Sequence, residues 1–546
     1  MIAASKAKLL CLAACLVWAL PLAAERPPRA EIRTAIRIGT TSPMANYRAT
    51  HHTQPNAPVR EFPLRKPGSR PGGGGGGGGT SWTDPVLQTN PGNNNARSII
   101  NGGIDGLTSV GYVPPDTNIS VGNSQIVETV NVTYAVYDKT GHVLQPATAM
   151  HSIFAAAGPS SLCSSVDGGD PIVLYDKIDQ RWIISQLAYN GSLTDNHVCL
   201  AISASPDATG SYAAYDIPFG KDFPDYPKLG VWATGSWATP GSTSGVYFSA
   251  NIFSGGNTFA GVQMCGFPLA DVLNPQASFQ WVCSPTMSNL ASVLPADIEG
   301  STAAVNGTTS PAPSGAGEYF LGFTGTSAVQ LVQFTPNFAN DSVSISGPTN
   351  ISVPTFREAC GGGACVPQYG SGTRLDSLGD RLMYRLSYRN YAGTQSMVVS
   401  HSVQNSSSSS QTGVRWYQLT STGSSWTVAQ NGTFGPNDGL FRWMGSIAQD
   451  KQGNLGLGYS VSSASVYPYL AVTGKTANES GMELETLFNI GKGAQKSINR
   501  WGDYSSMSVD PSDDCTMWYA NEYLKRSGSY TNWGTYIASF KFNGCN

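Results

Sequence analysis

Residues 170–184 read Asp170-Pro171-Ile172-Val173-Leu174-Tyr175-Asp176 and then, after a turn, Gln180-Arg181-Trp182-Ile183-Ile184. The last copy of this pattern reads Arg500-Trp501-Gly502-Asp503-Tyr504, then Ser508-Val509-Asp510, then Thr516-Met517-Trp518-Tyr519. Each copy has a polar start containing Asp, a short apolar run, a turn and a second apolar run. Runs of this length and composition predict paired β-strands.

Seven such starts occur along the chain, which makes the repeat the main indicator of architecture. They lie at Asp116, Asp170, Asp225, Asp297, Asp376, Trp443 (where Asp is expected) and Asp503. Their spacing exceeds the roughly 40 to 50 residues of a four-stranded blade, so we expect inserted loops. The repeats predict an all-β fold, a single β-propeller of about seven four-stranded blades, with six or eight as alternatives. We expect residues 81–115 to supply an outer strand that closes the ring.

The composition agrees with a strand-rich fold. Only 12% of residues are charged, whereas glycine is abundant at 62 residues. Because Lys and Glu are scarce, long helices are not expected. The net charge of −3 gives no indication of a nucleic-acid partner or of an anionic membrane surface.

The N-terminal region has the features of export. Lys6 and Lys8 precede an apolar run over residues 9–24, and the small residues at its end predict signal cleavage near Ala24. A lipoprotein site at Cys15 is the alternative. We expect residues 1–24 to be a signal peptide, residues 25–80 a disordered leader with a glycine tract at 72–79, and residues 81–546 the propeller domain. A plain linker is favoured for the leader over a pro-segment, and a secreted protein, extracellular or periplasmic, without a membrane span is expected.

Cysteine usage supports the same compartment. Ten cysteines are present, and eight remain beyond the predicted signal peptide. An even number in an exported chain predicts disulfides. Neighbours along the chain suggest the pairs Cys163–Cys199, Cys265–Cys283, Cys360–Cys365 and Cys515–Cys545, although eight cysteines allow 105 pairings.

Several motifs resemble those of a widespread group of secreted, mostly uncharacterised bacterial β-propeller proteins. They are VPPDTN (113–118), DYPKLG (225–230), LDSLGDRLMYR (375–385) and RWGDYSSMSVDP (500–511). The resemblance covers residues 110–546. It implies the propeller fold and export, and it brings no settled activity.

The repeated aspartates are the first candidate site. If each begins the innermost strand of its blade, these carboxylates line one mouth of the channel, where propellers commonly bind ligands. Two of them, Asp503 and Asp225, are our candidates for acid and base in glycoside hydrolysis. The structural alternative is that each Asp caps its turn by accepting backbone N–H groups.

Arginine and aromatic residues near the same starts are candidates for ligand binding. Arg500 and Arg381 would hold an acidic substituent, with Trp501, Tyr504 and Tyr226 stacking on the sugar. Arg374, Arg385 and Arg442 occupy similar positions. The alternatives are pairing with neighbouring Asp residues and packing between blades.

These observations lead to one functional prediction with two rivals. We expect a monomer that binds an extracellular glycan or another cell-surface or matrix ligand. If it is an enzyme, the expected class is glycoside hydrolase or polysaccharide lyase. A non-catalytic adhesion or protein-interaction module is the alternative, and a secreted peptidase ranks lowest. The sequence has no HExxH, Gly-x-Ser-x-Gly or Walker motif. We expect no cofactor, with Ca²⁺ at the acidic run 510–514 as the alternative.

Overall fold

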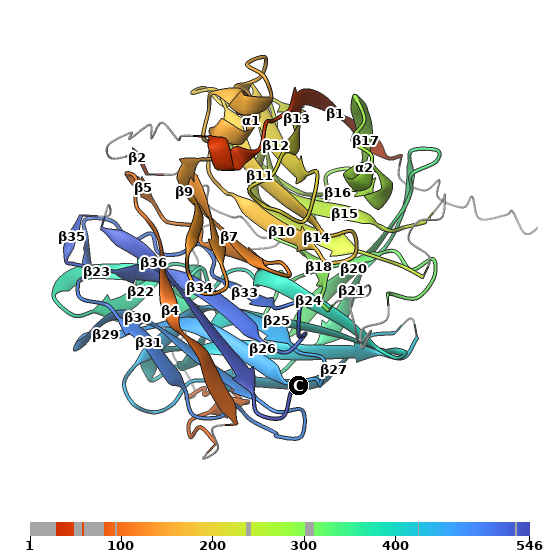
Figure 1. Cartoon of the computed structure of the whole chain (residues 1–546). Coiled ribbons are helices and arrows are strands. Elements are labelled where there is room, and N and C mark those ends of the chain that lie inside the picture. The colour runs from red at the N-terminus through yellow and green to blue at the C-terminus, as the bar shows by residue number, and fades with distance from the viewer. Residues whose placement is uncertain are drawn as a thin grey trace, which may run out of the picture.

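The computed structural model describes residues 29–47, 57–58, 81–92, 96–235, 242–300, 311–423, 425–529 and 532–546. The expected signal peptide and glycine tract lie outside these residues. Almost all regular structure in the described part is strand (Figure 1). No helix in these segments has the length and apolar character needed to cross a bilayer.

In the described residues, 28 of the 36 strands fall into seven antiparallel groups of four. Each group is a blade whose first strand is innermost, and the blades are numbered one to seven in chain order. Blade one is β6 (Asn118–Val121), β7 (Gln125–Val130), β8 (Thr133–Asp138) and β9 (Val143–Ala149). Blade two is β10 (Ile172–Asp176), β11 (Arg181–Tyr189), β12 (Asn196–Ser203) and β13 (Tyr212–Gly220). Blade three is β14 (Phe223–Trp232), β15 (Gly245–Ser254), β16 (Thr258–Pro268) and β17 (Ser278–Cys283).

The remaining blades follow the same order, except that the last one borrows a strand. Blade four is β18 (Leu294–Ile298), β19 (Glu318–Gly322), β20 (Ala328–Asn337) and β21 (Ser342–Ser352). Blade five is β24 (Met383–Tyr391), β25 (Thr394–Ser406), β26 (Ser409–Ser421) and β27 (Thr427–Phe434). Blade six is β28 (Phe441–Gln449), β29 (Leu455–Ser463), β30 (Val466–Lys475) and β31 (Thr486–Ile490). Blade seven is β33 (Ser506–Val509), β34 (Met517–Leu524), β36 (Trp533–Phe542) and β4 (Arg97–Thr108).

The innermost strands form a closed ring. β6 lies against β10, and β10, β14, β18, β24, β28 and β33 follow in turn until β33 lies against β6. Side chains of one blade hydrogen-bond the backbone of the next: Asn118 accepts the Val173 N–H at 3.0 Å, and the Ser506 hydroxyl donates to the Ile119 carbonyl at 3.1 Å. This closed radial arrangement is that of a β-propeller, as the repeats predict.

Strand β4 closes the ring in the way that the sequence predicts. It pairs antiparallel with β36, so that residues from near the N-terminus complete the last blade. Figure 1 shows the orange β4 beside the blue strands of the C-terminal region. The blade therefore joins segments more than 400 residues apart in the chain, Phe542 opposite Arg97.

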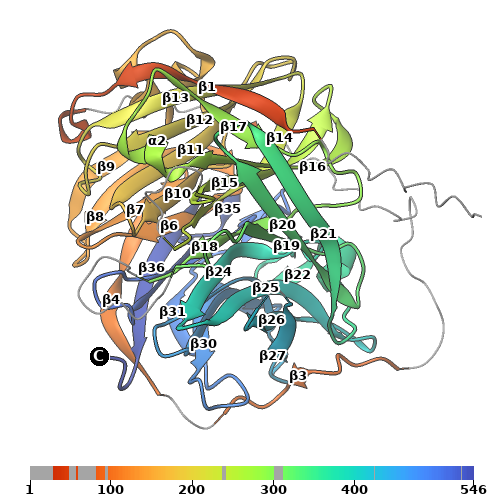
Figure 2. The ribbon, with the colours of Figure 1, turned by 90° about the vertical axis from the view of Figure 1, so that its right-hand side faces the viewer.

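Part of the leader is ordered, which corrects the prediction of a disordered segment over residues 25–80. Strand β1 (Glu31–Thr40) lies between β13 and β17 and joins the outer edges of blades two and three into one sheet. In Figure 2 it crosses from β13 to β17 in red. Two outer strands that would otherwise expose unpaired backbone groups are thereby covered.

Short elements decorate the ring. They are β2 (Ala57–Pro58), β3 (Leu87–Gln88), β5 (Tyr112–Val113), β22 (Ala364–Gln368), β23 (Ser371–Asp376), β32 (Gln495–Lys496), β35 (Gly528–Ser529), the helices α1 (His151–Ala157) and α2 (Leu269–Leu273), and the 3₁₀ turns Met44–Asn46, Leu162–Ser164 and Ala359–Gly362. β3 pairs with the outer strand β27, and the hairpin β22–β23 precedes blade five.

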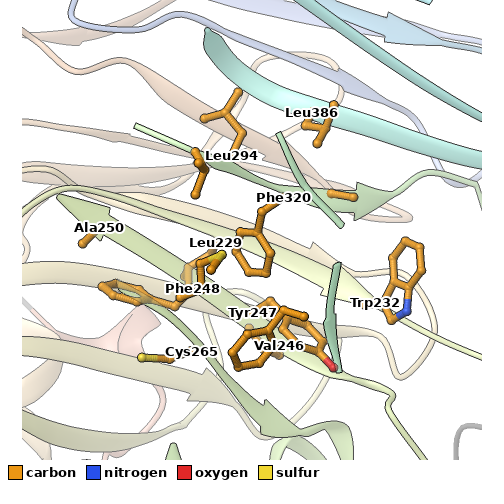
Figure 3. Packing of buried hydrophobic residues seen from close by; sticks show 14 of the residues in the cluster. Leu229, Trp232, Val246, Tyr247, Phe248, Ala250, Cys265, Leu294, Phe320 and Leu386 are labelled. Carbon is orange, nitrogen blue, oxygen red and sulfur yellow. The ribbon is translucent and has the colours of Figure 1, made fainter. Parts of the chain in front are cut away.

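The core lies between the blades because both faces of each sheet are apolar. Leu229 of β14, Phe248 of β15 and Phe320 of β19 are all fully buried in one cluster (Figure 3). Burying a side chain of this size contributes about 1.5 to 3 kcal/mol. The four disulfides join the cysteine pairs that proximity predicts: 163–199, 265–283, 360–365 and 515–545.

Candidate functional site

Four of the repeated aspartates gather at one end of the ring. Asp116, Asp170 and Asp503 stand shortly before β6, β10 and β33, and Asp225 lies in the first half of β14. The first three have φ angles of 53°, 50° and 58°. Aspartate tolerates this left-handed conformation better than most residues, so the repeat partly records a backbone requirement.

Burial, and then mutual repulsion, raise the pKa values of Asp116, Asp170 and Asp225. Burial, followed by the charge of Asp170, raises the pKa of Asp225 to about 8. Burial and the charge of Asp503 raise the pKa of Asp116 well above its usual range. The pKa of Asp170 is also raised, first by burial. At neutral pH the Asp225 carboxyl is therefore protonated, which is the condition for a proton donor.

The four carboxylates differ in their hydrogen bonds. Asp503 forms an ion pair with Arg500, and Asp170 accepts the Tyr226 N–H at 3.0 Å. Asp116 is buried, and its Oδ1 has no hydrogen-bond partner among the described residues. Asp225 is half-buried, and its carboxyl receives no hydrogen bond from the described part of the chain. Asp225 is thus the member that combines partial exposure, a raised pKa and an unengaged carboxyl.

Three cations lie among these carboxylates, and one of them, Arg381, forms an ion pair with Asp380 at 2.9 Å. Lys228 is fully buried, with its Nζ 3.5 Å from the ring centroid of Tyr226 and 4.0 Å from that of Tyr504. Burial lowers the pKa of Lys228 to about 8, although the negative charges of Asp170 and Asp116 act in the opposite direction and raise it. The Arg381 guanidinium lies 4.7 Å from the Tyr226 ring. Arg500, paired with Asp503, is the third.

The aromatic residues have another role than the one predicted. Trp501 is fully buried, packs against Trp443 at 5.9 Å and donates its indole N–H to Ser460 Oγ at 3.1 Å. Tyr504 is also fully buried and donates its hydroxyl to the Pro171 carbonyl at 3.2 Å, and Tyr226 is 5% exposed. The prediction that Trp501, Tyr504 and Tyr226 stack on a sugar needs correction, because Trp501 and Tyr504 are fully buried and the Tyr226 ring is covered by Lys228 and Arg381.

Two of the repeated aspartates take structural roles away from the cluster. Asp297 pairs with Arg385 at 2.6 Å and accepts the Val231 N–H at 3.0 Å. Asp376 accepts the Leu378 N–H at 3.0 Å, which is the capping alternative.

Only two of the five arginines considered from the sequence reach the cluster, namely Arg381 and Arg500. Arg385 is held by Asp297, whereas Arg442 binds Asp438 and Glu485 on blade six. Arg374 is exposed on β23. Each buried guanidinium thus finds a local carboxylate, as buried charges generally must.

Lys228 is the member of the cluster that sequence analysis missed. Its signal was present in the motif DYPKLG, where a lysine stands in the middle of the inner strand β14 and directly before an apolar run. Buried lysines are rare and are usually paired. The sequence did not reveal the two tyrosine rings around it, because Tyr226 and Tyr504 are far apart in the chain.

The acidic run 510–514 does not form one site. Asp510 pairs with Lys139 at 2.7 Å, Asp513 with Lys541 at 3.2 Å, and Asp514 with Arg389. Within the described segments no group of three or more His, Cys, Asp or Glu side chains is arranged to hold a metal ion. Each of these three carboxylates is thus bound to a basic side chain of its own.

Fold and site together define a β-propeller with a buried polar cluster, rich in carboxylates, at one end of its ring. No known family model matches the sequence, and no curated protein matches it. The resemblance to secreted bacterial propellers therefore stays a prediction.

Solved structures with a similar arrangement are distant in sequence. The WD40 domain of SCAP from fission yeast has 11% identity and a TM-score of 0.31, over 78% of this chain and 82% of that one. An α-L-arabinofuranosidase from Fusarium graminearum has 8% identity and a TM-score of 0.33, over 81% and 98%. An α-L-arabinanase mutant from Cellvibrio cellulosa has 9% identity and a TM-score of 0.29, over 70% and 96%. Likeness at this level carries no argument about function, which rests on the site itself.

Proposed function

We propose that this protein is secreted and binds an extracellular glycan at the cluster of Asp116, Asp170, Asp225 and Asp503, where it cleaves a glycosidic bond. The observation that carries the proposal is the state of Asp225. It is half-buried, accepts no hydrogen bond from the described residues and has a pKa raised to about 8. The four disulfides support an oxidising compartment.

The chemistry assigns different roles to the two candidate carboxyls. Asp225, protonated at neutral pH, donates its proton to the glycosidic oxygen as the carbon–oxygen bond breaks. Asp503, beside the Arg500 guanidinium, is the second carboxylate and either activates water or attacks the anomeric carbon. Arg381 and Arg500 offer positive charge to an acidic substituent of the glycan.

The first experiment is digestion of neutral, uronic-acid and sialylated polysaccharides, followed by mass spectrometry of the products. We expect products that carry an added water. Asp225→Asn should lower kcat/KM by about 10²- to 10⁴-fold, the usual contribution of a general acid. Activity of the unsubstituted protein should fall as the pH rises through about 8, because Asp225 then loses its proton.

A matched control tests whether the loss of activity is specific to Asp225 or follows from removing any carboxylate. Asp341 is exposed in the turn between β20 and β21 and has a φ of 54°, which asparagine also tolerates. Asp341→Asn should leave kcat/KM unchanged. Equal activity of Asp225→Asn and Asp341→Asn would remove Asp225 from the mechanism.

A non-catalytic binding module is the second candidate function. It is favoured by the structural partners of Asp170, Asp297 and Asp503, which are engaged without any ligand. Retention of the protein on a glycan without new product masses would support this candidate. Unsaturated product ends would instead indicate a lyase.

A further inference from the structure

A pocket lies far out on the ring, between blades four and five. It has a volume of about 260 Å³ and is formed by the second, third and fourth strands of blade four together with Ser425 and Trp426, which precede β27. Figure 2 shows β20 and β21 on the side that faces the viewer. The carboxylate cluster, by contrast, lies at the innermost strands.

An irregular strand pairing opens the pocket. Leu331 pairs with Thr349 and Gln333 with Ser346, so that one residue of β20 stands opposite two of β21, Gly347 and Pro348. Gly347 has a φ of 102°, and a Cβ there would come within 2.6 Å of the Leu331 carbonyl oxygen. Such bulges re-aim side chains at functional sites.

The floor of the pocket is aromatic and apolar. Tyr319 and Trp426 lie edge to face with ring centroids 5.1 Å apart, and they are 4% and 6% exposed. Leu331 and Ile351, 8% and 7% exposed, complete this floor. Surfaces of this kind bind the C–H faces of a sugar ring.

The rim of the pocket is polar and uncharged. It consists of Gln333, Ser346, Thr349 and Ser425, and the side chains of these four residues form no hydrogen bond with the described residues. Three hydroxyls and one amide are thus available as both donors and acceptors. No charged side chain lines the pocket.

We infer that this pocket binds one neutral sugar ring and is an accessory glycan site separate from the carboxylate cluster. The volume suits a single ring, because pockets for drug-sized ligands start at about 300 Å³. The apolar floor matches the carbon face of the ring, and the rim matches its hydroxyls. The lack of charge excludes preference for an acidic sugar. The inference does not depend on catalysis at Asp225.

The test is saturation-transfer NMR with methyl glycosides of glucose, galactose, mannose, xylose and N-acetylglucosamine on the whole mature protein. At least one probe should show saturable transfer that is strongest on one ring face. Ser346→Trp places an indole in the pocket from an exposed position of the outermost strand, and it should weaken that binding by about tenfold or more.

Two controls make the result specific. Ser344→Trp puts the same indole two residues away on the same face of β21, outside this pocket, and should leave binding unchanged. Asp225→Asn should lower the rate of cleavage and leave this signal intact, so the two proposals fail independently. The inference is overturned if no probe saturates, or if Ser346→Trp binds the probe as well as Ser344→Trp.

Discussion

Glu128 shows what a single buried acid does to the pH dependence of stability. It is fully buried on β7, accepts the Leu107 N–H at 2.9 Å, and burial raises its pKa to about 7. The unfolded chain has a pKa near 4.5, so the folded state binds more protons between pH 4.5 and 7. The free energy of unfolding should therefore fall as the pH rises through this window. Glu128→Gln should remove this pH dependence and raise the free energy of unfolding above pH 7 by on the order of 2 to 3 kcal/mol. Urea denaturation at several pH values measures this.

Asp138 provides the control, because it is partly exposed and its pKa is lowered to about 2, chiefly by its hydrogen bond with Thr140. Asp138→Asn should leave the slope between pH 4.5 and 7 unchanged. Other buried acids contribute the same slope in both proteins, so the difference between variant and parent isolates Glu128. If Glu128→Gln kept the full slope, this carboxyl would not titrate in the window.

Residue types were predictable from the sequence, whereas their partners were not. The Asp repeat indicated a carboxylate cluster, and four members do meet. The sequence did not separate Asp225, which accepts no hydrogen bond from the described residues, from Asp297, which is bound to Arg385. That difference depends on which neighbouring blade supplies a donor. Trp501 was misassigned for the same reason, since its burial depends on Trp443 of another blade.

At the scale of elements, β1 is held mainly by its backbone. It pairs with both β13 and β17, and Ala35 at its centre is its one fully buried described side chain. Ala35→Pro should detach the strand, because proline fits poorly inside a paired strand. The seven four-stranded blades do not include β1, so we expect the ring to stay folded. Hydrogen exchange should then show faster exchange confined to β1 and the facing edges of β13 and β17.

The matched variant for β1 is Ile36→Thr. Ile36 is 52% exposed, and threonine keeps a high preference for strands, so protection should not change. Loss of protection across all blades in Ala35→Pro would instead make β1 a requirement for the fold. No change at β13 and β17 would show that β1 contributes no protection there.

The sequence predicted the role of β4 and missed that of β1. Residues 81–115 adjoin the first repeat and contain a run that could close the ring, whereas residues 31–40 are separated from the domain by the glycine tract. Proximity along the chain is a guide only for segments with short connections. The pairing of β1 depends on the free edges of two other blades, which no local pattern reveals.

At the scale of the molecule, ring closure makes the disulfides unequal. Cys515–Cys545 holds the C-terminal end of β36 in the blade that β4 completes, and its cysteines are 30 residues apart. Cys360–Cys365 closes a loop of 5 residues beside blade five. Constraint of the unfolded chain predicts a contribution of about 3 to 4 kcal/mol for the first and about 2 kcal/mol for the second. The double variant Cys515→Ser/Cys545→Ser should therefore lower the free energy of unfolding more than Cys360→Ser/Cys365→Ser.

The location of increased hydrogen exchange shows whether a disulfide acts through closure of the ring or only through the length of the loop that it constrains. Without Cys515–Cys545, the end of β36 can fray and release β4, so hydrogen exchange should rise in β4 and β36 while blades two to five keep their protection. Without Cys360–Cys365 the seven inner strands and β4 remain in place, and added exchange should stay near residues 359–380. If both double variants lost equal stability and β4 kept its protection, the last disulfide would not contribute to closure, and the pairing of β4 with β36 would hold the ring by itself.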